Sequence, residues 1–163
     1  KEMFDAVTSV SFEQDIIIKA AAVADYRPAK VFDDKVKKQE GQMSIELEKT
    51  DDILQYLGDN RVPGQFLCGF SMETEHVVEN SKKKLEQKKL DMIVANNLKT
   101  AGAGFGTDTN VITIITKDSE QAFDLMSKAQ AADCILDAIC KQKNQNPFLT
   151  DAMECRLHSN SVR

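Results

Sequence analysis

The hydrophobic pattern of the chain predicts strands and helices that alternate through its first two-thirds. Strands are expected where apolar residues form short runs or alternate with polar ones, at 15–24, 43–48, 66–70, 91–95, 111–116 and, more weakly, 122–125. Helices are expected where apolar residues recur at helical spacing, at 3–10, from Thr50 onward, at 73–90 and at 128 to about 141. Such alternation is typical of an α/β domain with a largely parallel sheet.

Local patterns make some of these expectations more specific. The run 15–24 is almost wholly apolar, which predicts a strand buried on both faces. Strict alternation over 43–48 predicts a half-buried strand. Thr50 is expected to cap the helix that follows it, and Ser127 with Gln130 forms a capping box that opens the last helix.

The end of the chain has no clear periodicity. The whole sequence has 163 residues, which is enough for one domain with a buried core. We therefore predict one domain over 1–143, followed by a disordered tail over 144–163.

Composition narrows the class of function. The formal net charge of −5 argues against general nucleic-acid binding, whereas local lysine clusters at 35–38, 82–84 and 88–89 suit a small anionic ligand. The four cysteines lack the spacing of a zinc site or a disulfide framework, so they are expected to be reduced thiols. No apolar run approaches the ~20 residues of a membrane helix, and the first residues do not resemble a signal peptide. These features predict a cytoplasmic protein without a membrane or nucleic-acid partner.

Candidate chemistry gathers where the predicted strands end. Asp25 follows the strand 15–24, and Lys35 lies on the charged loop beyond it. Ligands of open α/β sheets bind outside the carboxyl ends of the strands, so Asp25 is placed to accept hydrogen bonds from a ribose or to hold Mg²⁺ beside phosphates. Phe70 ends the next buried strand, while Lys84 and Lys88 share one helix face. Each feature also has a structural interpretation: a turn cap for Asp25, core packing for Phe70, and a solvated face for the lysines.

Several common sites are absent from the sequence. The glycines at 102–106 precede a β-branched run instead of opening a helix, so they are not a dinucleotide fingerprint, and no P-loop motif occurs. His76 and His158 have no matching nucleophile from which a catalytic triad can be assembled. A third hypothesis, a NAD(P)-dependent reductase, is weakened by the absent glycine fingerprint and by the lack of a catalytic Tyr-Lys pair.

Six segments occur together in the order and spacing of a known family: AAVADYRP (21–28), KVKK (35–38), LEKTDDIL (47–54), GFSMET (69–74), KKLDMIVAN (88–96) and FGTDTN (105–110). Over about residues 1–143 they resemble the bacterial-type phosphopantothenoylcysteine synthetase, the second activity of the bifunctional coenzyme A biosynthesis flavoprotein. The resemblance implies an α/β fold: a three-layer Rossmann-like domain with a largely parallel sheet plus an antiparallel strand extension.

The resemblance also implies a two-step ligation. The carboxylate of 4'-phosphopantothenate attacks the α-phosphate of CTP, which gives an acyl-cytidylate and pyrophosphate. The amine of cysteine then displaces CMP and forms the amide. CTP and Mg²⁺ are thus the implied cofactors, although eukaryotic relatives generally use ATP.

By the same resemblance, the nucleotide contacts are Ala20, Ala21, Asp25, Lys35, Asp51, Asp52, Ile53, Leu54, Phe70, Lys84, Lys88 and Asn96. Lys35 is the implied catalytic residue, which reaches the phosphates from a mobile loop, and Asp25 is the implied metal ligand. Phe70 would line the base pocket. The family usually has Pro where this chain has Asp51.

The resemblance implies protein partners as well. The strand 43–48 and the segment 105–116 would be arms for a second copy in a homodimer, and a flavin-dependent decarboxylase domain would be fused or associated. Members also carry an amino-terminal segment with an Asn-x-Ser-Ser-Gly element, which nothing here matches. The alternative hypothesis is therefore a catalytically incomplete nucleotide-binding fragment or scaffold that needs another polypeptide.

Overall fold

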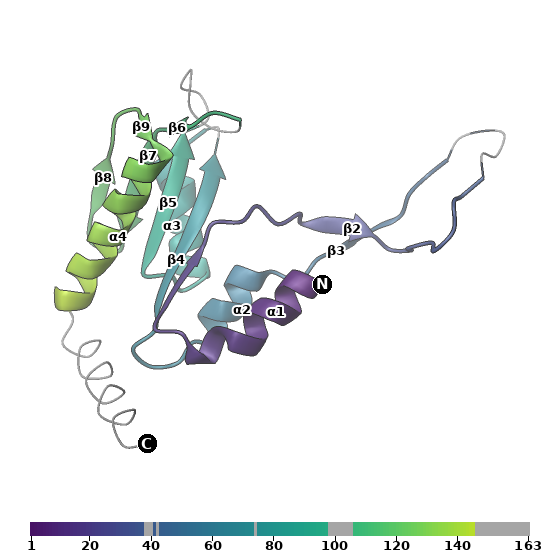
Figure 1. The fold of residues 1–163 in the computed structure, drawn as a ribbon, viewed down its shortest axis with the longest axis horizontal. Coiled ribbons are helices and arrows are strands. Elements are labelled where there is room, and N and C mark those ends of the chain that lie inside the picture. Colours follow the sequence, from purple (N-terminus) through teal and green to yellow (C-terminus); the bar gives the residue numbers. More distant parts are fainter. Residues whose placement is uncertain (38–40, 42, 74, 98–105, 146–163) are drawn as a thin grey trace.

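The computed structural model describes residues 1–37, 41, 43–73, 75–97 and 106–145. Within these ranges a five-stranded sheet has the order β1-β4-β5-β7-β8. Figure 1 labels β4, β5, β7 and β8 of this sheet. Its strands are β1 (Ile16–Lys19), β4 (Phe66–Glu73), β5 (Met92–Asn97), β7 (Ile112–Thr116) and β8 (Glu120–Ala122). β1, β4 and β5 are parallel, while β7 and β8 extend the sheet in antiparallel fashion.

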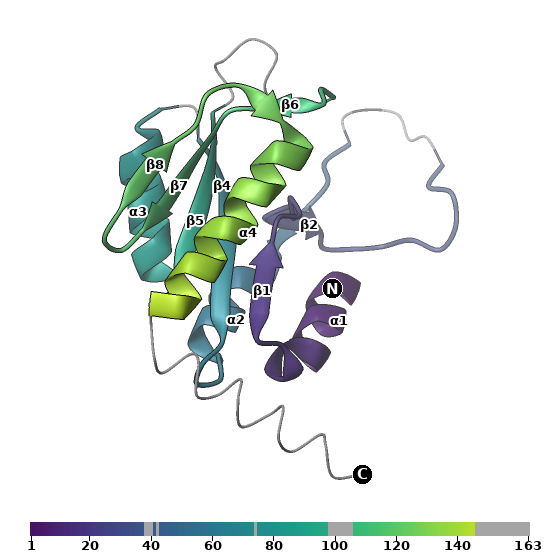
Figure 2. The same cartoon turned by 60° about the vertical axis from the view of Figure 1, so that its left-hand side comes forward.

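Helices cover both faces of this sheet. They are α1 (Glu2–Val10), the short 3₁₀ helix η1 (Ser11–Glu13), α2 (Ile53–Asp59), α3 (Val77–Gln87) and α4 (Lys128–Gln145). One buried cluster joins α2 and α3 to β4, β5 and β7, with α1 packed against it, and a second cluster joins α4 to the opposite face of the same strands. Figure 2 shows α4 in front of the sheet and α3 behind it. The predicted three-layer α/β domain with an antiparallel extension is confirmed.

Two pairs of short strands lie outside this sheet. β2 (Tyr26–Pro28) pairs antiparallel with β3 (Leu47–Lys49), and β6 (Thr109–Asn110) pairs with β9 (Met126–Ser127). We call residues 26–49 the arm, because β2 and β3 form its base and the described residues between them project away from the sheet in Figure 1. Arg27 Nε donates to Glu48 Oε1 across this base at 2.7 Å.

The predicted strand at 15–24 is wrong in length and in burial. Only Ile16–Lys19 forms a strand, and it lies at the edge of the sheet among the described residues. Ile17 packs against the cluster that contains α2, whereas Ile16 and Ile18 are 41% and 38% exposed. An apolar run reports strand propensity, but its exposure depends on what other segments cover it, and α4 packs over β4, β5 and β7.

Three other boundaries differ from prediction. The strand expected at 43–48 is reduced to Leu47–Lys49, whose residues are exposed because they pair only with β2. Asp52, rather than Thr50, caps α2: its Oδ1 accepts the backbone N–H of Gln55 at 3.0 Å. The helix expected at 73–90 is Val77–Gln87, since β4 continues to Glu73.

The end of the described chain agrees with the predicted capping box. Ser127 Oγ accepts the N–H of Gln130 at 3.2 Å, and Gln130 Oε1 accepts the N–H of Ser127 at 3.0 Å. The helix that follows continues through Gln145, so residues 144 and 145 are helical rather than disordered. The rest of the predicted tail, 146–163, lies outside the described residues.

The buried cysteine of the core, Cys68, is not suited to catalysis or metal binding. Cys68 is fully buried in β4, and burial raises the pKa of its thiol to about 12, with a further contribution from Asp91. A thiol with that pKa stays protonated and is a poor nucleophile or metal ligand.

Among the helices that the structure describes, none is long and apolar enough to cross a membrane.

Candidate functional site

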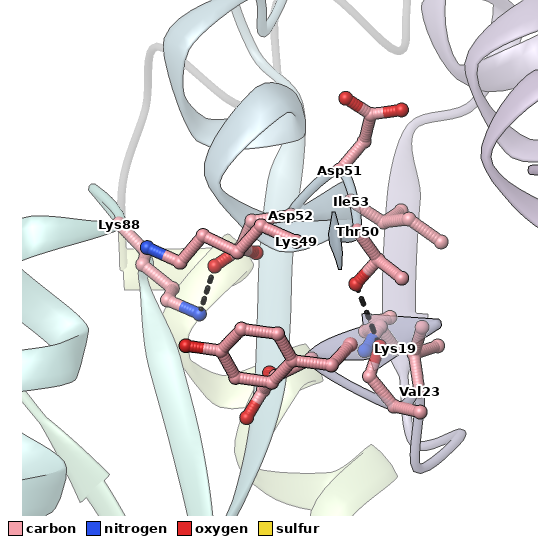
Figure 3. Close-up of a pocket in the computed structure, with 11 residues that line it drawn as sticks. Lys19, Val23, Lys49, Thr50, Asp51, Asp52, Ile53 and Lys88 are labelled. Atoms are coloured by element: carbon pink, nitrogen blue, oxygen red, sulfur yellow. Dashed lines mark hydrogen bonds and ion pairs between the residues drawn. The ribbon is translucent and has the colours of Figure 1, made fainter. Parts of the chain in front are cut away.

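A pocket of about 410 Å³ opens beside the carboxyl end of β1, between the base of the arm and the start of α2 (Figure 3). Its walls come from the end of β1, the loop that follows it, the strands at the base of the arm, the first residues of α2, and the end of α3. The lining residues are Lys19, Val23, Ala24, Asp25, Tyr26, Lys49, Thr50, Asp51, Asp52, Ile53 and Lys88. A pocket outside the carboxyl end of a parallel strand is the usual ligand position in open α/β sheets.

Thr50 holds two walls of the pocket together. Its Oγ1 donates to the carbonyl of Ala24 at 2.6 Å, and its backbone N–H donates to the carbonyl of Asp25 at 2.9 Å. Tyr26 pairs with Lys49 one residue further along the arm. These contacts fix the loop after β1 against the segment before α2, although the two are far apart in the sequence.

An ion pair spans the pocket. Lys88 Nζ donates to Asp52 Oδ2 at 2.8 Å, with the lysine side chain 23% exposed and the carboxylate 50% exposed. Burial alone would raise the pKa of Asp52, but the hydrogen bonds from Lys88 and from the Gln55 N–H, together with the charges of Lys88 and Lys19, lower it below its ordinary value. Asp52 is therefore ionised at neutral pH and holds Lys88 at the pocket.

Lys19 is a second ammonium group in the pocket. Its Nζ donates to the carbonyl of Ala21 at 3.1 Å. Partial burial lowers the pKa of Lys19; nearby Asp52 and Asp25 oppose this effect, and Lys88 adds to it. The pocket thus brings two lysines and two aspartates into electrostatic contact.

Close packing between α2 and α3 determines where Lys88 lies. A Cβ atom on Gly58 would come within 1.9 Å of the carbonyl oxygen of Lys88. Gln55 Nε2 also donates to the carbonyl of Gln87 at 3.2 Å, and Lys89 Nζ donates to Asp59 Oδ1 at 2.6 Å. The end of α3 is thereby held against α2, with Lys88 directed toward Asp52.

The structure brings five of the residues implied by the resemblance into this pocket: Asp25, Asp51, Asp52, Ile53 and Lys88. The other seven do not line it: Ala20, Ala21, Lys35, Leu54, Phe70, Lys84 and Asn96. Ala20 and Ala21 are exposed on the adjoining loop, and Lys35 is exposed on the arm. Their proposed nucleotide contacts stay predictions.

Four of these seven residues have contacts elsewhere in the fold. Leu54 is buried in the core cluster beneath α2. Phe70 packs against the cluster on the α4 face of the sheet. Lys84 Nζ donates to Glu73 Oε1 at 2.6 Å, and Asn96 Oδ1 accepts from Asn110 Nδ2 at 3.0 Å.

Sequence reasoning missed about half of the lining: Lys19, Val23, Ala24, Tyr26, Lys49 and Thr50. Lys19 interrupts the apolar run at the last position of its strand, which is where a ligand-facing side chain is expected. That signal was available in the sequence. Nothing local marks Lys49 or Thr50, because their place depends on the pairing of β3 with β2.

The Asp52–Lys88 pair predicts a pH response. The pKa of Asp52 in the folded protein is expected to lie below the ordinary carboxyl value of about 3.9 and to rise in Lys88→Met. Because the folded value is the lower one, the pair stabilises the fold above the ordinary pKa, and this contribution is lost as pH falls through the folded value. Half of the carboxylate is exposed, so the contribution is small. The measurement is an NMR titration of the side-chain carboxyl carbon.

Lys89→Met provides the matched control for this titration. Lys89 hydrogen-bonds Asp59 and lowers the pKa of that carboxylate, so its removal should raise the pKa of Asp59 and leave Asp52 unchanged. An Asp52 pKa that does not respond to Lys88→Met would contradict the ion pair.

Comparison with known proteins places this chain in a family. The profile of the DNA/pantothenate metabolism flavoprotein C-terminal domain matches residues 1–142. The coenzyme A biosynthesis bifunctional protein CoaBC of Bacillus subtilis (strain 168) is 47% identical over 145 residues, which cover 88% of this chain and 36% of that protein. A cysteine/cysteine sulfinic acid decarboxylase from an unknown prokaryotic organism is 45% identical over 139 residues, which cover 85% of this chain and 39% of that protein.

A solved structure agrees with the sequence comparisons. The crystal structure of the C-terminal domain of a coenzyme A biosynthesis bifunctional protein CoaBC matches with a TM-score of 0.71 at 40% identity, covering 89% of this chain and 65% of that one. The chain spans a little more than a third of the length of the two curated relatives. The resemblance found in the sequence is confirmed: the chain belongs to the DNA/pantothenate metabolism flavoprotein C-terminal domain family.

Proposed function

We propose that the chain is a phosphopantothenate–cysteine ligase domain of coenzyme A biosynthesis, with CTP as its co-substrate. The observation that carries the proposal is the pocket at the carboxyl end of β1, where Asp25, Asp52 and Lys88 meet. These residues come from three segments that match the family in order and spacing. Their similarity to a coenzyme A biosynthesis bifunctional protein supports the same chemistry here.

The proposed reaction requires charge neutralisation rather than a covalent intermediate on the protein. In its first step the carboxylate of 4'-phosphopantothenate forms a bond to the α-phosphorus of CTP, and the bond to the departing pyrophosphate breaks. In its second step the cysteine amine attacks the acyl carbon, CMP leaves with the electron pair, and the amine loses a proton. Lysines near the phosphates stabilise negative charge in both steps, which is the main route to rate enhancement in phosphoryl transfer.

The pocket supplies the groups that such neutralisation needs. Lys88 is held at its edge by Asp52, and Lys35 is proposed to approach from the exposed arm as the catalytic cation. The nucleotide is proposed to contact the implied set of residues, including the seven that do not line the pocket. Of these, Lys84, Phe70 and Asn96 have other contacts in the present structure.

Magnesium fits this pocket as a companion of the phosphates. Among the described residues no group of three or more His, Cys, Asp or Glu side chains is arranged to hold a metal ion. Mg²⁺ characteristically takes one or two carboxylates plus substrate phosphate oxygens, and Asp25 lines the pocket with such a carboxylate. Asp25 would hold the ion, which would supply positive charge to the phosphate chain.

The test of the proposal is product formation by the folded chain. The chain is mixed with Mg²⁺, CTP, 4'-phosphopantothenate and cysteine, and pyrophosphate release is measured together with the mass of the amide product. We expect pyrophosphate and amide in equal amounts, and a slower reaction when ATP replaces CTP. Saturable CTP binding without either product would support the alternative, an incomplete nucleotide-binding fragment that needs another polypeptide.

We propose that a homodimer forms through the arm. Several apolar side chains of the arm are exposed, including Val31 at 88%, Phe32 at 64% and Ile45 at 65%. Exposed apolar groups in such number on a projecting segment favour a protein partner. Sedimentation equilibrium is expected to give twice the mass of one chain, and Ile45→Asp should shift the equilibrium toward the monomer. Leu136→Asp on α4, where the leucine is 51% exposed, is the matched control and should leave the dimer intact.

The remaining partners follow from the relatives. A flavin-dependent decarboxylase domain is proposed as a fused or associated partner. The names of the relatives support it: one is a bifunctional protein, another is a decarboxylase, and the family is described as the C-terminal domain of a flavoprotein. A cytoplasmic location is proposed with it, because relatives are named as enzymes of coenzyme A biosynthesis.

A further inference from the structure

We infer that Lys19 is a direct phosphate contact in the pocket, in addition to the lysines that the family resemblance implies. The inference rests on the proposed function and names a binding residue for the polyphosphate chain of the nucleotide. It starts from the position of Lys19, which ends β1 and lines the pocket together with Lys88 and Asp52 (Figure 3).

The contacts of Lys19 leave room for a ligand. Its Nζ donates one hydrogen bond, to the carbonyl of Ala21, and an ammonium group has three protons to donate. Lys88 differs, because its Nζ is paired with Asp52 at 2.8 Å. Among the described residues, no carboxylate lies within ion-pair distance of Lys19. A partly buried cation without an ion-pair partner gains most from an anion that enters the pocket.

The charge pattern favours a multiply charged anion over a single carboxylate. Lys19 and Lys88 are close enough for the charge of Lys88 to lower the pKa of Lys19, so the two ammonium groups repel each other across the pocket. Asp52 lies near both lysines and Asp25 acts on Lys19 as well, so the aspartates offset part of the positive charge, but neither forms an ion pair with Lys19. A polyphosphate carries several negative oxygens along its length and can contact both lysines at once. A carboxylate would satisfy one of them.

The position of Lys19 in β1 also determines on which face of the strand its side chain lies. Ile17 and Lys19 lie on the same side of the strand, because side chains two residues apart share a face. Ile17 packs against the core cluster that contains α2, so this side of β1 is the one that α2 covers. Lys19 therefore extends toward the start of α2, where Asp52 lies, rather than toward the open face that carries Ile16 and Ile18.

Three variants test the inference. Lys19→Met removes the charge and keeps most of the length of the side chain, while Lys19→Arg keeps the charge. Lys83→Met is the matched control, because Lys83 is exposed on α3, pairs with Glu79 and does not line the pocket. Circular dichroism melting checks that each variant is folded. Calorimetry with CTP, cytidine, inorganic tripolyphosphate and 4'-phosphopantothenate then measures binding in the presence of Mg²⁺.

We expect Lys19→Met to weaken CTP and tripolyphosphate binding by about 10- to 100-fold, the range of a charge-assisted hydrogen bond. Cytidine binding should not change, Lys19→Arg should recover most of the affinity, and Lys83→Met should behave like the unsubstituted chain. Wild-type CTP affinity in a folded Lys19→Met protein would overturn the inference and leave the proposed function standing. An effect confined to 4'-phosphopantothenate would overturn it as well, because Lys19 would then serve the acid substrate.

Tripolyphosphate separates this inference from the proposed function. Tripolyphosphate binding that requires Lys19, with no binding of CTP, would support the phosphate contact and contradict the nucleotide function. No binding of CTP or of tripolyphosphate to the folded chain would overturn both.

Discussion

Replacement of Gly58 by alanine is expected to lower the free energy of unfolding by about 3 kcal/mol. The added Cβ would lie 1.9 Å from the carbonyl oxygen of Lys88 and 2.9 Å from its carbonyl carbon. These are backbone atoms, so no side-chain rotation relieves the clash, and α2 has to move away from the end of α3. In an unobstructed helix the same change would stabilise by about 0.5–1 kcal/mol, so the sign of the effect is itself a test. Urea unfolding followed by circular dichroism measures it.

Glu86→Ala is the control for this experiment. Glu86 is exposed on α3, close to the same junction, and its removal should change the free energy of unfolding by less than about 0.5 kcal/mol. A Gly58→Ala protein that is as stable as the unsubstituted chain, or more stable, would contradict the close packing of α2 on α3. The movement of α2 should also weaken nucleotide binding, because Asp52 begins this helix and holds Lys88.

Lys88→Met is expected to weaken CTP binding by about 100-fold. Two effects act in the same direction. The phosphate chain loses a charge-assisted hydrogen bond from Nζ, and Asp52 loses its partner and then repels the phosphates. Together they correspond to about 2.7 kcal/mol, which is within the range measured for truncation of one partner of a charged pair. Calorimetric titration with CTP and Mg²⁺ measures the change.

Substitutions of two neighbouring lysines serve as controls for the Lys88→Met prediction. Lys89→Met removes the adjacent charge, which pairs with Asp59 outside the pocket, and should leave CTP binding unchanged. Lys84→Met tests a nucleotide contact that only the resemblance implies, because Lys84 pairs with Glu73 and does not line the pocket. CTP affinity that is equal in Lys88→Met and Lys89→Met would contradict the position of the site.

Much of the fold could be predicted from local sequence patterns. The strand predicted at 91–95 is apolar from Met92 to Ala95 and becomes a buried central strand, since both faces of β5 are covered by helices. The capping box of Ser127 and Gln130 involves residues three apart, so it could be read without knowledge of the fold. Patterns of this kind depend on neighbours in the sequence.

The predictions that were wrong concern features that depend on segments distant in the sequence. Ile16 and Ile18 look like core residues, but their exposure is decided by whether another segment covers β1. Thr50 has the right side chain for a helix cap, yet its hydroxyl donates to Ala24 across the base of the arm and Asp52 takes the cap instead. The choice between these two nearby capping residues is therefore settled by a tertiary contact.

The candidate site shows the same division. Asp25 was predicted from its place after a strand, and it lines the pocket. Lys49 was not predicted, because only the pairing of β3 with β2 brings it there. Phe70 also ends a predicted strand, but side chains alternate between the two faces of a sheet, and its side chain packs on the α4 face. The ends of predicted strands therefore indicate where a site lies. Which face of the sheet each side chain lies on becomes clear only from the structure.

The most direct test of the central claim is a crystal structure of the chain with CTP and Mg²⁺. We expect electron density for the phosphate chain in the pocket beside the carboxyl end of β1, in contact with Lys19 and Lys88 and near Asp25. Nucleotide density on the α4 face of the sheet, or an empty pocket in crystals that contain saturating CTP, would contradict it.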